Sequence, residues 1–281
     1  MKKIGYILYS FVPAIIALCL EFIATFFVLG VTALYFLYSP AEKGFQYSTL
    51  LELLSDYNFN IILSMIFSLS CIIIFGIWYY WRYEGDYLPR PSKTFHPLTL
   101  LGIILMVPGA QYISSIIMVI ASSIKPALLE EYTELLESTG LSDDVPLLMI
   151  IYAVVLAPVG EELIFRGVTL RAARKALPFW FANILQALLF GIFHMNILQG
   201  LYTFAFGLLL GYVCEKGGSI YYSILLHLLY NLWGTCISQL IDFGDNDMAY
   251  LALMGASILI SIGGVILFRK GSRKKQLAIR K

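Results

Sequence analysis

Long apolar runs, separated by short polar stretches, repeat along almost the whole chain. A run of about 20 apolar residues can cross the hydrocarbon core of a bilayer as a helix. The pattern therefore predicts an all-α, polytopic membrane protein with eight transmembrane helices, at 8–37, 61–81, 98–121, 147–168, 179–197, 199–214, 220–241 and 248–268. The fifth and sixth runs are separated by hardly any polar residue, so their boundary is the least defined.

The composition agrees with this class, because hydrophobic residues make up 59% of the chain and charged residues 13%. Soluble domains contain roughly 45–50% apolar and about 25% charged residues. The four cysteines show no C-x-x-C spacing, so we expect small buried apolar side chains rather than a disulfide framework.

Basic and acidic residues are divided between alternate loops, and this division predicts the topology. With the N-terminus in the cytoplasm, only Lys43 and Lys125 among the 19 Lys and Arg fall outside, as the positive-inside rule requires. Both termini are then cytoplasmic. The outer loop at 122–146 carries glutamates at helical spacing, which predicts an amphipathic surface helix. The basic tail after the last span should bind anionic lipid headgroups.

We divide the chain into three regions. They are an N-terminal three-helix region at 1–146, a core at 147–241, and a last helix with its basic tail at 242–281. Within the core, Gly207-x-x-x-Gly211 would allow close contact with another helix, although chance small residues explain it equally well.

Three ionisable residues lie within six positions of the fourth apolar run, where a charge is costly and usually has a function or a partner. Glu162 and Arg166 are four apart on one helix face, so they should form an ion pair. Glu161 points about 100° away from Glu162 and remains the unpaired acid, suited to act as a general base. Glu21 in the first run is interpreted as a neutral or paired carboxyl rather than a proton or ion site.

Two further runs contribute polar groups. His194 ends Phe190-Gly-Ile-Phe-His194, while His227 and Asn231 share one face of the seventh run. At about 1.5 Å per helical residue, these groups can converge with Glu161 in the middle of the membrane; we expect the site to open toward the cytoplasm. A carboxylate and an imidazole can activate water, and an imidazole and an amide can hold an oxyanion. A dyad of Ser223 with His227 is a weaker alternative.

The motifs Glu161-Glu162-Leu-Ile-Phe-Arg166, Phe190-Gly-Ile-Phe-His194 and His227-Leu-Leu-Tyr-Asn231 together resemble the CPBP family, which contains CAAX proteases and bacteriocin-processing (Abi) enzymes. The resemblance implies an eight-helix intramembrane endopeptidase. It implies that Glu161 and His194 activate water, that His227 and Asn231 hold the oxyanion, and that Glu162, Arg166 and Phe190 support them. It implies no cofactor; the alternative is zinc held by Glu161, His194 and His227.

The expected substrate is a membrane-embedded or lipidated peptide or protein, cleaved in the cell membrane of a bacterium. We expect no nucleic-acid partner. Another class of function is a non-catalytic membrane protein that regulates a sensor kinase or confers bacteriocin self-immunity. A transporter is a weaker option, because we find no paired repeats of the kind that many transporters contain.

Overall fold

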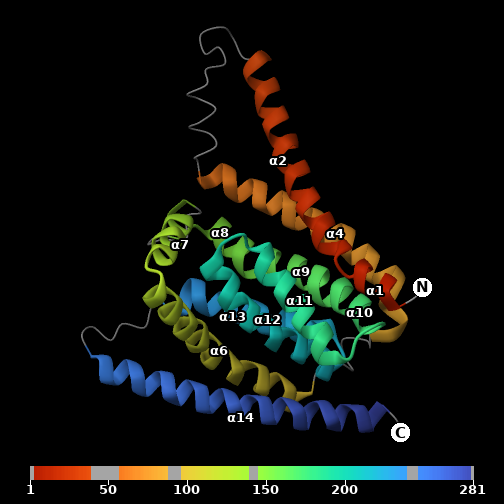
Figure 1. Cartoon of the computed structure of the whole chain (residues 1–281), viewed down its shortest axis with the longest axis vertical. Helices are drawn as coiled ribbons and strands as arrows, with labels where there is room; N and C mark the ends of the chain where they lie inside the picture. The colour runs from red at the N-terminus through yellow and green to blue at the C-terminus, as the bar shows by residue number, and fades with distance from the viewer. Residues whose placement is uncertain (1–2, 39–56, 88–95, 139–144, 239–245, 280–281) are drawn as a thin grey trace.

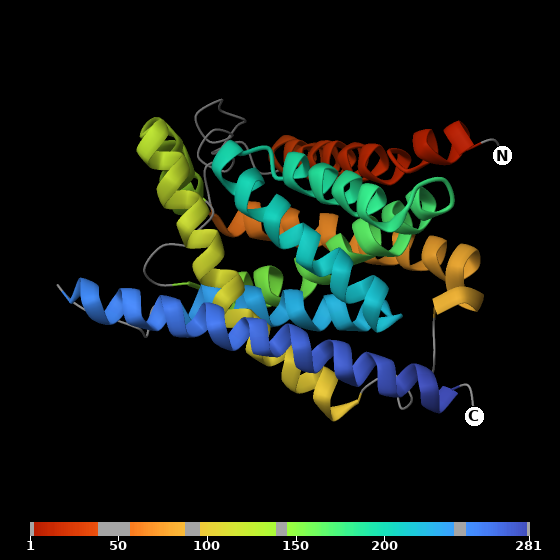
Figure 2. The same ribbon diagram turned by 60° about the horizontal axis from the view of Figure 1, so that its bottom comes forward.

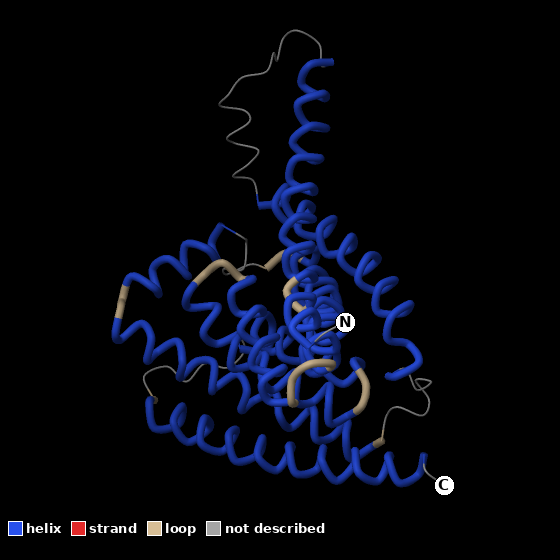
Figure 3. Tube along the Cα trace, turned by 45° about the vertical axis from the view of Figure 1, so that its right-hand side comes forward, coloured by secondary structure: helices blue, strands red, loops and turns tan. Residues whose placement is uncertain are grey.

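The computed structural model describes residues 3–38, 57–87, 96–138, 145–238 and 246–279, and these residues form helices joined by short turns. The elements are α1 (Lys3–Tyr9), α2 (Val12–Tyr38), α4 (Tyr57–Tyr87), α6 (Pro97–Ile124), α7 (Ala127–Ser138), α8 (Leu147–Ile151), η2 (Tyr152–Leu156), α9 (Ala157–Glu162), η3 (Leu163–Thr169), α10 (Leu170–Arg174), α11 (Phe179–Phe193), α12 (Ile197–Gly217), α13 (Ile220–Leu232), η4 (Trp233–Ile237) and α14 (Asp247–Ile279). No strand occurs in the described part of the chain (Figure 3). The predicted all-α class is confirmed.

Seven helical segments of the described residues are long and apolar enough to span a membrane, and they match seven of the eight predicted runs. The predicted fifth run forms the shorter helix α11 instead. It ends at Phe193 because His194 is its C-cap, Met195 has a φ of 54° and Asn196 caps the next helix by accepting a hydrogen bond from the Gln199 N–H. This turn is the boundary that the apolar pattern left undefined.

The helices alternate in direction, so the two chain ends lie at the same end of the bundle (Figures 1 and 2). We call this end the terminal face; it carries the α10–α11 and α12–α13 turns. The opposite end, the loop face, carries α7 and the α11–α12 turn. On α7, all four glutamates at positions 130, 131, 134 and 137 are exposed, which confirms the predicted amphipathic helix.

Helices α11 and α12 approach each other closely along small residues. A Cβ placed on Gly191 would lie 2.6 Å from the Gly200 carbonyl oxygen, and one on Gly207 would lie 3.2 Å from Ala187. A Cβ on Gly211 would overlap the Asn183 side chain, which is buried. The close contact predicted from Gly207 and Gly211 is therefore confirmed.

Replacing Gly191 with alanine should separate α11 from α12, because the new methyl group meets backbone that cannot rotate away. Overpacking of this kind costs about 1–3 kcal/mol. We expect Gly191→Ala to lower the midpoint of thermal unfolding in detergent. The control is Gly255→Ala on α14, where a Cβ meets nothing within 4 Å. Equal midpoints for the two variants would contradict this packing.

Candidate active site

The helix that carries the paired glutamates is not a regular α-helix. Between Leu147 and Arg174 it contains two π-helical segments, η2 and η3, which lie on either side of α9 with Glu161 and Glu162. A third π segment, η4, begins two residues after Asn231. Such segments often occur at functional sites, because an extra residue in one turn changes the direction of the following side chains.

Glu162 and Arg166 form a fully buried ion pair in the interior of the bundle. The Arg166 guanidinium donates to Glu162 Oε1 at 2.8 Å, and both side chains are 0% exposed. A second guanidinium nitrogen donates to the Gly207 carbonyl oxygen at 3.3 Å, and the group lies 4.4 Å from the centre of the Phe190 ring. The predicted ion pair is confirmed, and it links the fourth span to α11 and α12.

His227 lies between the two glutamates. Its Nδ1 is 2.9 Å from Glu162 Oε1, and its Nε2 is 3.6 Å from Glu161 Oε2. Because a carboxylate can only accept a hydrogen bond, His227 Nδ1 is protonated and donates to Glu162. The rings of Phe190 and Phe206 hold the imidazole by edge-on contacts. The buried ion pair thus orients His227 so that Nε2 faces Glu161.

His194 is held by its own helix end. Its Nδ1 lies 2.8 Å from the Phe190 carbonyl oxygen, so Nδ1 donates and Nε2 keeps its lone pair. The two rings also meet edge-on, with centres 4.8 Å apart. Phe190 therefore contacts Arg166, His194 and His227 together, which explains its place in the predicted motif.

Asn231 is held in place by one hydrogen bond from its side-chain amide nitrogen. Its Nδ2 donates to the Ala153 carbonyl oxygen in η2 at 2.8 Å. The carboxamide nitrogen has a second hydrogen that this bond does not use. Ser223, the alternative nucleophile, is buried and donates to the Ile220 carbonyl oxygen at 3.0 Å.

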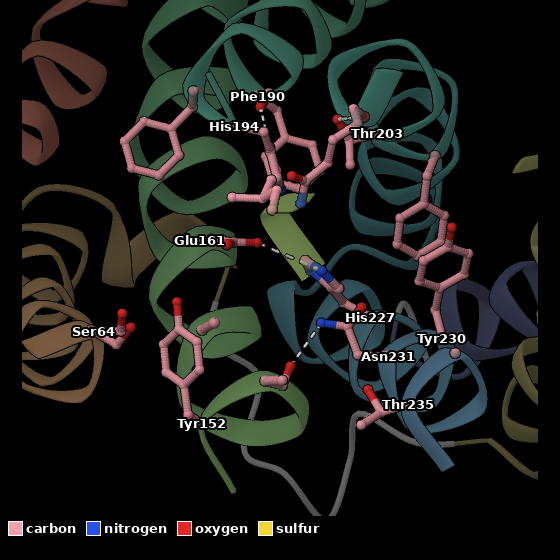
Figure 4. A pocket seen from close by; sticks show the side chains of 18 of the residues that line it. Ser64, Tyr152, Glu161, Phe190, His194, Thr203, His227, Tyr230, Asn231 and Thr235 are labelled. Carbon is pink, nitrogen blue, oxygen red and sulfur yellow. Dashed lines mark hydrogen bonds and ion pairs between the residues drawn. The ribbon is translucent and has the colours of Figure 1, made fainter. Parts of the chain in front are cut away.

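One cavity of about 660 Å³ joins the predicted residues (Figure 4). Glu161, His194, His227 and Asn231 all line it, so the structure brings these four groups together from three helical segments. Glu161 retains 20% side-chain exposure, whereas Glu162 has none. Glu161 is therefore the glutamate that water and substrate can reach. The catalytic roles of the four groups remain predictions.

Sequence reasoning missed much of the polar wall of this cavity. Tyr152, Thr203 and Thr235 line it together with Ser64 of α4 and Gln111 of α6 (Figure 4). Glu21 of α2 also lines it, although the sequence favoured a purely structural carboxyl there. Hydroxyl and amide side chains are common in membrane helices, so only the helix rotations reveal which of them face the site.

The cavity lies nearer the loop face than the terminal face. The cavity continues from Glu161 toward Met149, Gln199 and Ser238, which lie near the loop face. We expected an opening toward the cytoplasm, on the side of both termini. The side chains in the terminal-face halves of the helices pack together. The membrane side toward which the cavity opens stays a prediction.

The zinc alternative depends on how the His, Cys, Asp and Glu side chains in the described part of the chain are arranged. Within the described ranges, no group of three or more His, Cys, Asp or Glu residues is positioned to hold a metal ion. His227 instead has a carboxylate oxygen near each of its two ring nitrogens.

Comparison with known proteins agrees with the motif analysis. Residues 143–233 match the family model described as Type II CAAX prenyl endopeptidase Rce1-like. The chain is 29% identical over 120 residues to a Bacillus subtilis (strain 168) protein named "Putative membrane peptidase YdiL"; the match covers 43% of this chain and 47% of that protein, less than half of either. No solved structure matches the chain. The resemblance to the CAAX protease family is thus confirmed over 143–233, which includes all three motifs.

Proposed function

We propose that this protein is an intramembrane endopeptidase that hydrolyses a peptide bond with a water activated by Glu161 and His194. The observation that supports it most is the shared cavity. Four polar groups from three helical segments line one pocket within the bundle, and the reachable carboxylate is the one left outside the buried ion pair. The local match to the Rce1-like family model and the resemblance to a protein named as a membrane peptidase support peptide-bond hydrolysis.

In the proposed reaction, Glu161 takes one proton from the water, while His194 Nε2 accepts a hydrogen bond from the O–H that remains. The oxygen attacks the carbonyl carbon, and the carbonyl oxygen becomes an oxyanion. Glu161 then returns the proton to the leaving amine as the C–N bond breaks, which gives one carboxyl and one amine product. Positioned acid–base groups of this kind contribute about 10²–10⁴-fold to a rate.

The oxyanion would be held by His227 and Asn231. Asn231 offers the second hydrogen of its anchored amide. His227 donates from a protonated Nε2, and its Nδ1–H remains bonded to Glu162. Oxyanion donors fixed in advance are worth about 10²–10³ in kcat. Arg166 balances the Glu162 charge, and Phe190 packs against Arg166 and both imidazoles.

The substrate that fits this setting is a membrane-associated or lipidated peptide or protein. Its scissile segment would enter a pocket bordered by the spans. We place the enzyme in the plasma membrane of a bacterium, with anionic lipid at the basic C-terminal tail.

Zinc held by Glu161, His194 and His227 is the alternative to a metal-free mechanism. We expect purified protein to contain far less than one zinc per chain, and its activity to survive a chelator. Elemental analysis and an activity assay after chelation measure both. Stoichiometric zinc, or activity lost on chelation and restored by zinc alone, would favour the metal mechanism instead.

A comparison of peptides in cells tests the proposed function itself. Cells that lack the protein should accumulate an uncut membrane peptide. Wild-type protein should remove it, whereas Glu161→Ala and His194→Ala at equal membrane levels should not. Removal of the peptide by both variants would instead indicate a non-catalytic partner of a sensor or immunity protein.

A further inference from the structure

We propose that the cavity receives its substrate from the extracytoplasmic side of the membrane, as a peptide segment exposed at the outer leaflet. This inference rests on the proposed function and narrows its substrate class, because it excludes lipidated tails held at the cytoplasmic leaflet. Three independent features of the structure support it: the position of the lining residues, the packing beneath them and the distribution of charge.

The lining residues lie toward one end of the bundle. In α4 they lie between Leu63 and Cys71, and in α6 between Gln111 and Met118, which are the halves nearest the loop face. In α12 they lie between Gln199 and Phe206, at its loop-face start. The segment α13–η4 contributes from His227 onward, up to the exposed Ser238. Residues nearer the middle of their spans also contribute, among them Glu21 and Thr25 of α2 and Glu161 of α9.

The opposite half of the bundle is closed. Arg166, Phe165 and Leu210 are fully buried directly beneath the site, and Cys214 and Tyr222 are fully buried nearer the terminal face. Arg171 is also buried in this half, with its guanidinium 3.6 Å from the Glu215 carboxylate. No residue of this half lines the cavity, so a substrate approaching from the terminal face would have to displace packed side chains and a buried ion pair.

Charge identifies the terminal face as the cytoplasmic one. It carries Arg174, Lys175, Lys216 and the basic end of α14, whereas Lys125 is the one basic residue that the described structure places at the loop face. The loop face carries the exposed glutamates of α7 instead. Under the positive-inside rule, the basic end remains in the cytoplasm.

Helix α7 lies at the mouth of the cavity. Tyr132, Leu135 and Leu136 turn inward and line it, and the Tyr132 hydroxyl is 3.1 Å from that of Tyr202. Its glutamates face outward. An amphipathic helix of this kind suits the outer membrane surface, so the mouth opens where an outer-leaflet peptide segment can reach Glu161.

Thiol labelling in intact cells tests the side of opening without any catalytic readout. The four native cysteines are replaced with alanine, and one reporter cysteine is introduced per variant. Thr235→Cys reports on the cavity wall, Glu137→Cys on the exposed face of α7 and Lys216→Cys on the terminal face. A small charged methanethiosulfonate that does not cross membranes is applied before and after permeabilisation. Membrane level and elution profile confirm that each variant is folded.

We expect the Thr235→Cys and Glu137→Cys proteins to react in intact cells, and the Lys216→Cys protein to react only after permeabilisation. Reaction of the Thr235→Cys protein only after permeabilisation, together with the Lys216→Cys protein, would overturn the proposal. So would a Thr235→Cys protein that stays unlabelled while the Glu137→Cys protein reacts. Because labelling needs no turnover, loss of the proposed protease function would not change any of these outcomes.

Discussion

Glu161→Gln should reduce cleavage of the accumulated membrane peptide by about 10²–10⁴-fold, because an amide cannot take the proton from water. The substitution keeps the size of the side chain. It also leaves the Glu162–His227 and Glu162–Arg166 contacts in place. We therefore expect normal membrane level and normal thermal unfolding, with kcat as the quantity that falls.

The matched control is Glu137→Gln, which neutralises an exposed carboxylate on α7 without touching the cavity. It should cleave like the wild type. If Glu161→Gln cleaved at the wild-type rate, Glu161 would not be the general base. A loss of activity that accompanies a lower unfolding midpoint would assign it a structural role instead.

Arg166→Ala should be the most destabilising single substitution in the site. It leaves the buried Glu162 carboxylate without its guanidinium partner and removes the hydrogen bond to the Gly207 carbonyl oxygen. Removing one partner of a buried ion pair costs about 3–5 kcal/mol. The measurement is the free energy of unfolding in detergent, or the unfolding midpoint where unfolding is irreversible.

Arg174→Ala is the control for this effect. Arg174 also contacts a glutamate, with its Nε 3.1 Å from Glu215 Oε1, but it is 33% exposed. Pairs that solvent reaches contribute about 1 kcal/mol or less. The double variant Glu162→Gln with Arg166→Met should recover part of the loss, because it removes the uncompensated charge. Equal losses for Arg166→Ala and Arg174→Ala would contradict the account.

The sequence predicted the elements of the site well because membrane helices obey simple rules. An ionisable residue in an apolar run is conspicuous, so Glu161, Glu162, Arg166, His194 and His227 could be found without coordinates. The spacing of four residues between Glu162 and Arg166 then predicted their ion pair, because residues four apart share one helix face. These inferences use only one helix at a time.

The contacts that the sequence did not predict depend on how each helix is rotated about its axis relative to its neighbours. Nothing in the spacing shows that His227 contacts Glu162 through one nitrogen and faces Glu161 with the other. That arrangement depends on the rotation of α13 and on the π segments beside α9, which have no clear sequence signal. The same holds for Tyr152 and Thr235, which resemble many other polar residues in the spans.

The position of the cavity near the loop face could not be predicted from the sequence, for a related reason. Helical rise places a residue at a depth in the membrane, but it does not show on which side the neighbouring helices pack tightly. The closed half of the bundle depends on large side chains from several helices, such as Tyr222 against Phe268, with ring centres 5.6 Å apart. Only the assembled structure shows that the cavity around Glu161 extends toward the loop face.

The most direct test of the central claim is a double-mutant cycle on single-turnover cleavage by purified protein. It compares the wild type with Glu161→Gln, His194→Ala and the double variant. If Glu161 and His194 act on one water, the double variant should be hardly slower than the slower single variant, because groups that act as a unit are not additive. Multiplied losses, or cleavage that persists in the double variant, would contradict the account.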